Sequence, residues 1–429
     1  MKTSDKLVIV DYISGLKNEI YFDEETIKHS GCSVLSDIYM PRASYWLSVG
    51  RKYPVAVKYL SRLSLVLWVH GVSTLYFLCN FIYFILIKNF KQYKNITMGL
   101  DEGAVIIASK KTSELLCNKI YEELPKIWVV LPWVDVAQPP KNIRTIFLLE
   151  LLKNRDLLRV FCLSIASVNI VKSRDNLRNW SLQTYTAFRW FAVRLAIDKM
   201  GGELVITSHY DRWAVLIDRA VSASSSCTDS RLQKKLTMVQ HGSLGDIGRN
   251  SSSNNKGVPT RIKNVRHLFA YDENEVGEFF RKVLKNEALT ICCINFFEPQ
   301  ISLIGQLQAG VISVLVVSHP LCESFQINIL KELSKTEDLF VYFKPHPRAR
   351  TSVENADINI LKYHRIMSKN DQFPLVDFVI SYPSTLVKEY GSHGINAVVH
   401  SIDSSRNEMP AVIDEVMHLI KKLKINKHI

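Results

Sequence analysis

Residues 339–348 have the sequence LFVYFKPHPR, an apolar run that ends abruptly in a basic turn with two prolines. A short run rich in aromatic and β-branched residues predicts a buried strand, and the prolines fix the turn and prevent a helix from forming directly after it. In doubly wound sheets, ligands bind beyond the carboxyl ends of the strands. The strand would therefore deliver Lys344, His346 and Arg348 to a binding crevice, where their natural partner is the phosphate of a nucleotide donor.

A second segment of the same kind follows about thirty residues later, VDFVISYPST at residues 376–385. It predicts a strand that ends in a hydroxyl-rich turn, followed by a helix over Thr385–Ser392. Free backbone N–H groups at the start of a helix bind phosphate, and the hydroxyls of Ser384 and Thr385 are additional donors. Taken together, the two turns predict one anion site made by two neighbouring strand ends in the later half of the chain.

The rest of the chain alternates apolar strands with helices, which predicts an α/β fold with parallel sheets covered on both faces. A length of 429 residues favours two such domains, because single cores stop growing near ~250–300 residues. We expect two Rossmann-like domains facing a central cleft: residues 1–245 on the acceptor side, with a hydrophobic helical segment at 63–87, and residues 265–429 binding the nucleotide donor. Strands are expected at Leu7–Val10, Asn95–Met98, Val105–Ala108, Ile127–Leu131, Arg159–Ser164, Leu204–Thr207, Thr237–Gln240, His267–Tyr271, Leu289–Cys293, Ser313–Val317, Leu339–Phe343, Phe378–Ile380 and Ala397–Val399.

Composition limits the classes of partner. Hydrophobic residues make up 47% and charged residues 22%, which is ordinary globular usage. A net charge of +13 favours anionic partners such as lipid head groups or phosphorylated substrates. Nucleic acid is disfavoured, because the chain has no recognition-helix, zinc-finger or aromatic RNA-binding pattern.

The eight cysteines form no CxxC pair, which predicts buried, reduced thiols. The N-terminus has no signal-peptide core. From these two features we expect the protein to be cytoplasmic.

The segment from Leu63 to Ile87 contains no charged residue and is long enough to cross a bilayer. Three interpretations remain open: a membrane span, a helix lying in the membrane interface, and helices buried in the core. A span conflicts with the expected strand Leu7–Val10, because it would separate that strand from the rest of its sheet. We expect a protein that is cytoplasmic and peripheral to the inner membrane.

Two further segments carry candidate catalytic groups. Asp101 and Glu102 follow an expected strand and precede a glycine, and a carboxylate at such a strand end can take the proton from an attacking hydroxyl. His241 lies in the segment VQHGS at the end of another strand, and imidazole can serve as the base instead. The base is therefore Asp101 or Glu102, or else His241.

The turn at residues 344–348 followed by Ser381 to Thr385 resembles the HP and serine-pair motifs of bacterial sialyltransferases and polysialyltransferases. It is also similar to those of capsule Kdo transferases and teichoic-acid glycerophosphotransferases, and the HG of VQHGS resembles the last two groups. Asp101-Glu102-Gly103 looks like the acidic motif of the sialyltransferases. These families share the GT-B architecture, and the resemblance implies that His346, Ser384 and Thr385 engage the donor phosphate. The chain departs in having Ser-Thr for two serines, and Tyr-Pro where glycerophosphotransferases often have Asp-Tyr.

The resulting hypothesis is a metal-independent glycosyltransferase that moves a sugar, such as sialic acid or a related acidic sugar, from a CMP- or CDP-linked donor to a cell-surface glycan or glycolipid. It needs no cofactor, and the chain has no DxD-like pair at a strand end for a divalent ion. Three alternatives remain: a CDP-polyol phosphotransferase of the teichoic-acid or capsule type, a nucleotide-sugar isomerase of the same fold, and an inactive scaffold in a capsule-assembly complex.

Overall fold

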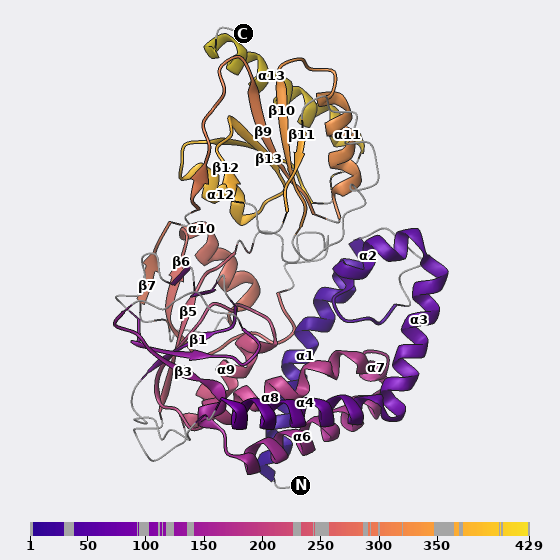
Figure 1. Ribbon diagram of the computed structural model, residues 1–429, viewed down its shortest axis with the longest axis vertical. Coiled ribbons are helices and arrows are strands. Elements are labelled where there is room, and N and C mark those ends of the chain that lie inside the picture. Colours follow the sequence, from indigo (N-terminus) through magenta and orange to yellow (C-terminus); the bar gives the residue numbers. More distant parts are fainter. Residues whose placement is uncertain are drawn as a thin grey trace.

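The computed structural model describes residues 3–29, 38–91, 93, 103–109, 112–113, 115–116, 124–134, 141–225, 233–242, 244, 257–285, 291, 293–298, 301–319, 321–346, 364–368, 372–402, 404 and 406–427. Two sheet regions are stacked along the long axis of the molecule, and helices from the first ninety residues lie beside the lower one (Figure 1). The chain begins at the lower end and finishes at the upper end.

The first sheet has seven parallel strands in the order β3-β2-β1-β4-β5-β6-β7. This is the strand order of a Rossmann sheet, in which the direction of winding reverses between β1 and β4. The strands are short apolar runs, as expected for a parallel sheet that is buried on both faces. Their bounds are β1 Ala104–Ile107, β2 Ile127–Val130, β3 Arg144–Phe147, β4 Gly202–Ile206, β5 Lys234–Val239, β6 Val265–Ala270 and β7 Cys293–Phe296.

Helices cover one face of this sheet and form the larger hydrophobic core. Strand residues such as Ile106 and Leu204 pack there against α1 (Thr3–His29), α6 (Asn154–Lys172), α8 (Ala187–Ile197) and α9 (Arg212–Ser224). Alternate strand residues, such as Val105 and Val205, enter a second core on the opposite face. Further helices are α2 Ala43–Lys52, α3 Pro54–Leu67, α4 Ser73–Phe90, α7 Asp175–Arg178 and α10 Glu273–Glu278.

The second sheet has five parallel strands in the order β11-β10-β9-β13-β14, again a Rossmann order, with its reversal between β9 and β13. Helices α11 (Glu323–Leu333) and α13 (Met409–Lys427) cover one face, and α12 (Thr385–Gly391) packs with the other. The strands are β9 Ile312–Val317, β10 Leu339–Lys344, β11 His364–Ile366, β13 Phe378–Ser381 and β14 Asn396–Val399, and β8 Leu303–Ile304 pairs separately with β12 Phe373–Pro374. The predicted α/β class with two Rossmann-like sheets is confirmed.

Two of the predicted strands are helices. Leu7–Val10 lies inside α1, where Ile9, Tyr12 and Leu16 are buried at helical spacing, while Leu7 itself is exposed. Arg159–Ser164 lies inside α6, whose buried residues also recur every three or four positions. In both cases a four- to six-residue apolar run belongs to a longer pattern with the 3.6-residue period of a helix.

The boundary between the sheets also differs from the prediction. β6 pairs with β5 and β7 pairs with β6, so residues 265–296 belong to the first sheet. The change to the second sheet therefore lies between Phe296 and Ile312 rather than near residues 245–265. Of the strand expected at Leu289–Cys293, the structure describes only Ile291 and Cys293, and β7 begins at Cys293. The edge strand Arg144–Phe147 was not expected. The strand expected at Asn95–Met98 lies outside the described residues.

The predicted burial of the cysteines is wrong for three of the positions that the structure describes. Cys322 is buried, whereas Cys79, Cys162 and Cys293 are exposed. Cys79 and Cys162 lie on the outward faces of α4 and α6, where the apolar character of a thiol did not lead to burial.

The hydrophobic segment forms one bent helical unit, α3, a π-helical turn (Trp68–Val72) and α4. The bend lies at Gly71, whose φ of 149° is a backbone conformation that residues with a Cβ rarely adopt. Within the described part of the chain, Pro54–Phe90, 37 residues, is the one helix that is long and apolar enough to cross a membrane by length and composition. Only 17% of its most apolar 18-residue window is buried, so these helices are not core helices of the ordinary kind.

Candidate functional site

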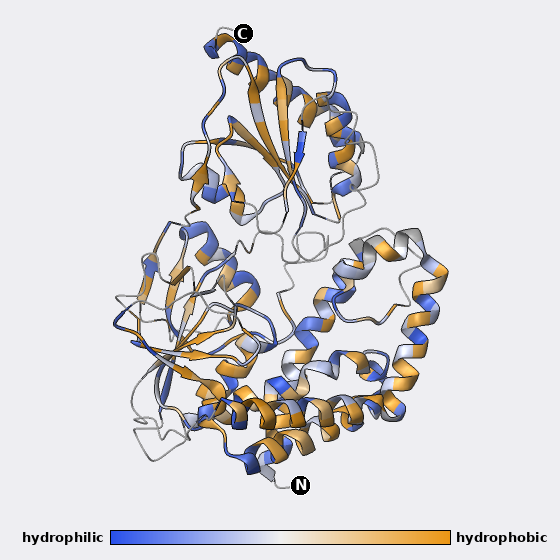
Figure 2. Cartoon of the chain, viewed as in Figure 1, coloured by the Kyte–Doolittle hydropathy of each residue, from blue (hydrophilic) through white to orange (hydrophobic). Residues whose placement is uncertain are grey.

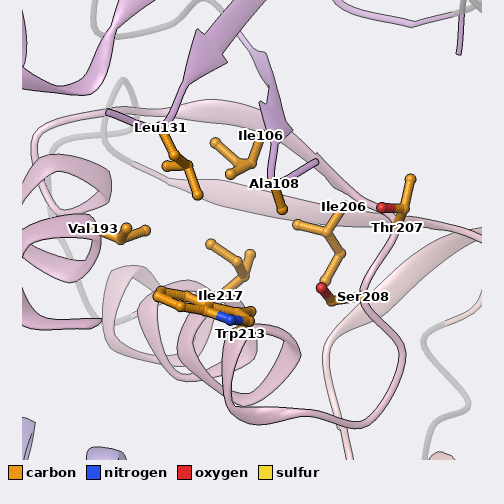
Figure 3. A pocket seen from close by; sticks show the side chains of 9 residues that line it. All are labelled: Ile106, Ala108, Leu131, Val193, Ile206, Thr207, Ser208, Trp213 and Ile217. Atoms are coloured by element: carbon orange, nitrogen blue, oxygen red, sulfur yellow. The ribbon is translucent and has the colours of Figure 1, made fainter. Parts of the chain in front are cut away.

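The carboxyl edge of the first sheet carries a row of hydroxyls at its point of reversal. Thr207 follows β4, and its Oγ1 lies 3.0 Å from Thr112 Oγ1, which in turn lies 2.9 Å from Ser109 Oγ after β1. A small pocket opens beside them between the sheet and helices α8 and α9 (Figure 3). None of its nine lining residues is charged, so this pocket is not the anion site that the sequence predicted.

Two histidines meet at the ends of β4 and β5. The backbone N–H of His241 donates to Nε2 of His209 over 3.1 Å, and Nδ1 of His241 lies 3.2 Å from the same atom. His209 is buried, and burial together with the neighbouring His241 ring holds the pKa of His209 well below its usual range. The same Nε2 lies 3.4 Å from the carbonyl oxygen of Val239, so this nitrogen contacts both a donor and an acceptor. His241 itself is exposed.

Gln240 and Glu275 hold the turn that contains His241. The buried amide of Gln240 donates to the carbonyl of Gly242 over 3.0 Å and to Glu275 Oε2 over 2.9 Å. The same carboxylate oxygen accepts from the backbone N–H of Leu244 at 3.0 Å. Glu275 is 4% exposed, so these bonds form in a low-dielectric environment and fix the position of the turn.

At the carboxyl edge of the second sheet, three aromatic rings form a continuous group. The ring of His319, after β9, lies 4.8 Å from that of His346 and 5.2 Å from that of Tyr382, centroid to centroid. Nδ1 of His319 accepts from the backbone N–H of Leu321 at 3.2 Å. Burial, and to a lesser degree the proximity of His346, lowers the pKa of His319 to about 3.

The two turns predicted to be neighbours are therefore separated by one strand. β9 lies between β10 and β13, and His319 at its end bridges the turn with His346 and the turn with Tyr382 and Ser384. His319 was not among the residues predicted from the sequence. Its signal is a His-Pro pair one residue after the apolar run of β9, as His346 and Pro347 stand one residue after β10.

The hydroxyl turn after β13 is ordered by its own side chains. Ser384 Oγ lies 3.0 Å from Ser381 Oγ, and Ser381 Oγ donates to the carbonyl of Tyr382 over 2.7 Å. Ser384 precedes α12 at the N-cap position but makes no side-chain cap hydrogen bond. The hydroxyl of Ser384 is therefore directed along the turn toward Ser381 rather than into the helix that follows.

The edges of the two sheets meet at Gly242 and Thr385. A methyl group at Gly242 would lie 3.4 Å from Oγ1 of Thr385, which places the turn after β5 against the turn after β13. Beside this contact, Nζ of Lys388 on α12 lies 2.6 Å from Asp272 Oδ2 and 3.0 Å from Glu275 Oε1. Figure 1 shows α12 and α10 together at this junction.

Comparisons with known proteins identify no family. No protein-family model matches the chain, and no curated protein matches it. Among solved structures, the chain is similar to the wall teichoic acid polymerase TagF in its complex with CDPG, with 8% sequence identity and a TM-score of 0.33 over 76% of this chain and 78% of that chain. A likeness of this size carries no argument about function.

The predicted site residues divide into three groups. His241, His346, Ser384 and Thr385 lie at the facing edges of the two sheets. Lys344 ends β10 with its amine 4.8 Å from the centre of the Phe373 ring, on the face of the sheet that contains α12. Asp101, Glu102 and Arg348 lie outside the described residues. Among the residues that are described, no three or more His, Cys, Asp or Glu side chains are grouped to hold a metal ion.

Proposed function

We propose that this chain is a transferase that uses a nucleotide-activated donor, with a sugar on a CMP- or CDP-linked donor as the transferred group and a hydroxyl of a cell-surface glycan or glycolipid as the acceptor. The observation that carries this proposal is the contact of Gly242 with Thr385. It brings a histidine turn of the first sheet against a hydroxyl turn of the second, next to His346. In doubly wound sheets, ligands bind beyond the carboxyl ends of the strands at the point of reversal, and β9 and β13, which precede His319 and Ser384, flank that point in the second sheet.

The base in this proposal is His241. In this arrangement Nδ1 of His241, 3.2 Å from Nε2 of His209, would carry the proton, and Nε2 of His241 would be the basic nitrogen. That atom would take the proton from the acceptor hydroxyl as its oxygen attacks the donor carbon. Asp101 and Glu102 remain the alternative base of the sequence hypothesis.

The departing nucleotide would be stabilised from the second sheet. As the bond between the sugar carbon and the phosphate oxygen breaks, its electron pair passes to that oxygen. His346 and the hydroxyls of Ser384 and Thr385 would donate hydrogen bonds to the phosphate, with Lys344 and Arg348 adding positive charge. The ring of His319 packs edge-on against the ring of His346. This contact would limit rotation of the His346 side chain before the donor binds.

Transfer of a polyol phosphate is the second candidate, and the position of His241 favours it equally. In that reaction the acceptor oxygen attacks phosphorus rather than carbon, and CMP leaves. Product analysis after incubation with CMP-sialic acid or CDP-glycerol distinguishes the two reactions by the group that the acceptor gains. A nucleotide-sugar isomerase would instead convert the donor with no acceptor present.

Nucleotide binding tests the proposal without knowledge of the acceptor. In thermal-shift measurements with CMP, CDP, UDP and GDP, we expect CMP or CDP to stabilise the protein, by about 2.7 kcal/mol at a concentration of 100 Kd. His346→Ala should abolish this shift, whereas His418→Ala, an exposed position on α13, should leave it unchanged. No shift with any nucleotide would exclude a nucleotide-activated donor, and an unchanged shift in His346→Ala would remove His346 from the site.

A further inference from the structure

One face of α4 exposes a continuous apolar stripe. Its large apolar residues recur every three or four positions, so they share one side of the helix. They are Leu75 (61% exposed), Leu78 (39%), Ile82 (47%), Leu86 (47%) and Phe90 (83%). Figure 2 shows α4 almost continuously in the hydrophobic colour. Exposed apolar area of this extent on a folded domain marks an interaction surface.

The stripe continues across the bend onto α3. Exposed apolar residues there again follow helical spacing: Val55 (63% exposed), Tyr59 (69%), Leu63 (56%) and Val66 (53%). The bend itself is anchored to the rest of the protein, because the buried indole of Trp68 donates from Nε1 to Thr184 Oγ1 over 2.9 Å. Each of the two helices therefore presents an exposed apolar stripe, and we call the two stripes together the α3–α4 face.

The opposite side of α4 is packed on the protein. Phe77 and Phe84 are buried, and the ring of Phe84 lies 5.1 Å from that of Phe188 on α8. Nζ of Lys88 is buried and donates to the carbonyl of Leu152, just before α6. A helix that is attached along its length to a polar, globular domain cannot be surrounded by lipid on all sides. It can lie along the surface of a bilayer.

The charge of this region identifies the surface that it fits. From Ile38 to Leu100 the chain has no Asp or Glu and has eight basic residues, namely Arg42, Arg51, Lys52, Lys58, Arg62, Lys88, Lys91 and Lys94. Apart from Lys88, whose amine is buried against the Leu152 carbonyl, these residues flank the exposed apolar stripes in sequence, and basic residues in such positions complement anionic lipid head groups. Two copies of the α3–α4 face would instead bring like charges together, which disfavours self-association through it.

We propose that the α3–α4 face docks this chain onto the interface of an anionic phospholipid bilayer, with its apolar side chains inserted among the head groups and no segment crossing the membrane. This surface lies on the helices of the first ninety residues, away from the contact of Gly242 with Thr385. The proposal is therefore independent of the transferase assignment.

Vesicle flotation with the full-length protein tests this proposal. We expect wild type to float with vesicles of phosphatidylglycerol and phosphatidylcholine, and to bind pure phosphatidylcholine vesicles more weakly. The triple variant Leu75→Glu, Ile82→Glu and Leu86→Glu should lose binding by at least about tenfold, because failure to bury even one leucine side chain corresponds to roughly that factor. These side chains are already in contact with water, so far-UV circular dichroism and the melting temperature should be unchanged.

A matched control places the same charges on exposed apolar residues elsewhere, Phe296→Glu, Ile304→Glu and Leu307→Glu, which are 54%, 45% and 43% exposed in the wild type. It should float like wild type. Equal flotation of the α3–α4 variant and wild type would overturn the proposal. So would a wild-type dimer that this variant converts to a monomer, since a second copy would then cover the face. Resistance of membrane-bound protein to alkaline carbonate extraction would instead show a span and would also overturn it.

Discussion

The surroundings of the His319 imidazole make the folded protein less stable as the pH falls. This imidazole is packed between the rings of His346 and Tyr382, and burial lowers its pKa to about 3, against an ordinary value near 6.5. A histidine with a depressed pKa in the folded state contributes stability that is fully present above its unfolded pKa. As the pH falls below about 6.5, the unfolded chain binds a proton that the folded protein does not, and this contribution is lost.

We therefore predict that the free energy of unfolding falls between pH 7 and pH 5, with about 2 kcal/mol of the decrease coming from His319. His319→Asn should reduce the decrease by that amount, and His418→Asn, an exposed position on α13, should not. Urea unfolding of the three proteins at both pH values measures it. Part of the decrease should remain in His319→Asn, because the pKa of buried His209 is also lowered. Equal decreases in wild type and His319→Asn would contradict the assignment.

Among the elements, the bend between α3 and α4 depends on a single glycine. A Cβ at Gly71 would meet no atom within 4 Å, so space does not restrict substitution there, but a φ of 149° does. Gly71→Ala should lower the free energy of unfolding by about 1–3 kcal/mol, the usual cost of a residue held in a sparsely populated backbone conformation. Thermal or urea unfolding measures the loss.

Gly277 in α10 supplies the matched control for this element. A methyl group there also meets no atom within 4 Å, but its φ is not positive. Gly277→Ala should leave stability unchanged or raise it slightly, because alanine is the better helix former. If both substitutions had the same effect, the conformation at Gly71 would not be required for the bend.

At the scale of the whole molecule, Lys388 joins the two sheet regions. Its amine lies 2.6 Å from Asp272 Oδ2 and 3.0 Å from Glu275 Oε1, across the junction. Burial alone would raise the pKa of Asp272, but the hydrogen bond and charge of Lys388 hold it below its usual range. Glu275 also fixes the His241 turn through Gln240, so this ion pair links the relative position of the sheets to the candidate base.

Lys388→Met should therefore loosen the junction, because it leaves a nearly buried carboxylate without its cation. We expect a loss of about 1–3 kcal/mol in stability and a larger radius of gyration by small-angle X-ray scattering. Lys335→Met removes an ion pair to Glu332 at the C-terminal end of α11, where the Lys335 side chain is 70% exposed, and should change neither quantity. An unchanged radius in Lys388→Met would show that other contacts hold the two regions.

The sequence by itself determined the fold class, most of the strands and the residue types at their carboxyl ends, because short apolar runs and prolines act locally. Local signals did not separate a strand from a helix at Leu7–Val10 and Arg159–Ser164. There, packing against other helices decides whether side chains are buried with the 3.6-residue period of a helix or the two-residue period of a strand. Nor did they assign β6 and β7 to the first sheet, since the partner of a parallel strand lies far away in sequence.

Only the tertiary structure placed His319 between two turns that had been expected to be adjacent, paired His209 with His241, and brought Gly242 against Thr385. It also showed that the apolar helix pair keeps one face on the protein and the other exposed. These features depend on strand order and on packing between residues distant in the chain. The physical reason is that hydrophobicity and backbone preference specify each element locally, whereas the surface that an element meets depends on how all the elements pack.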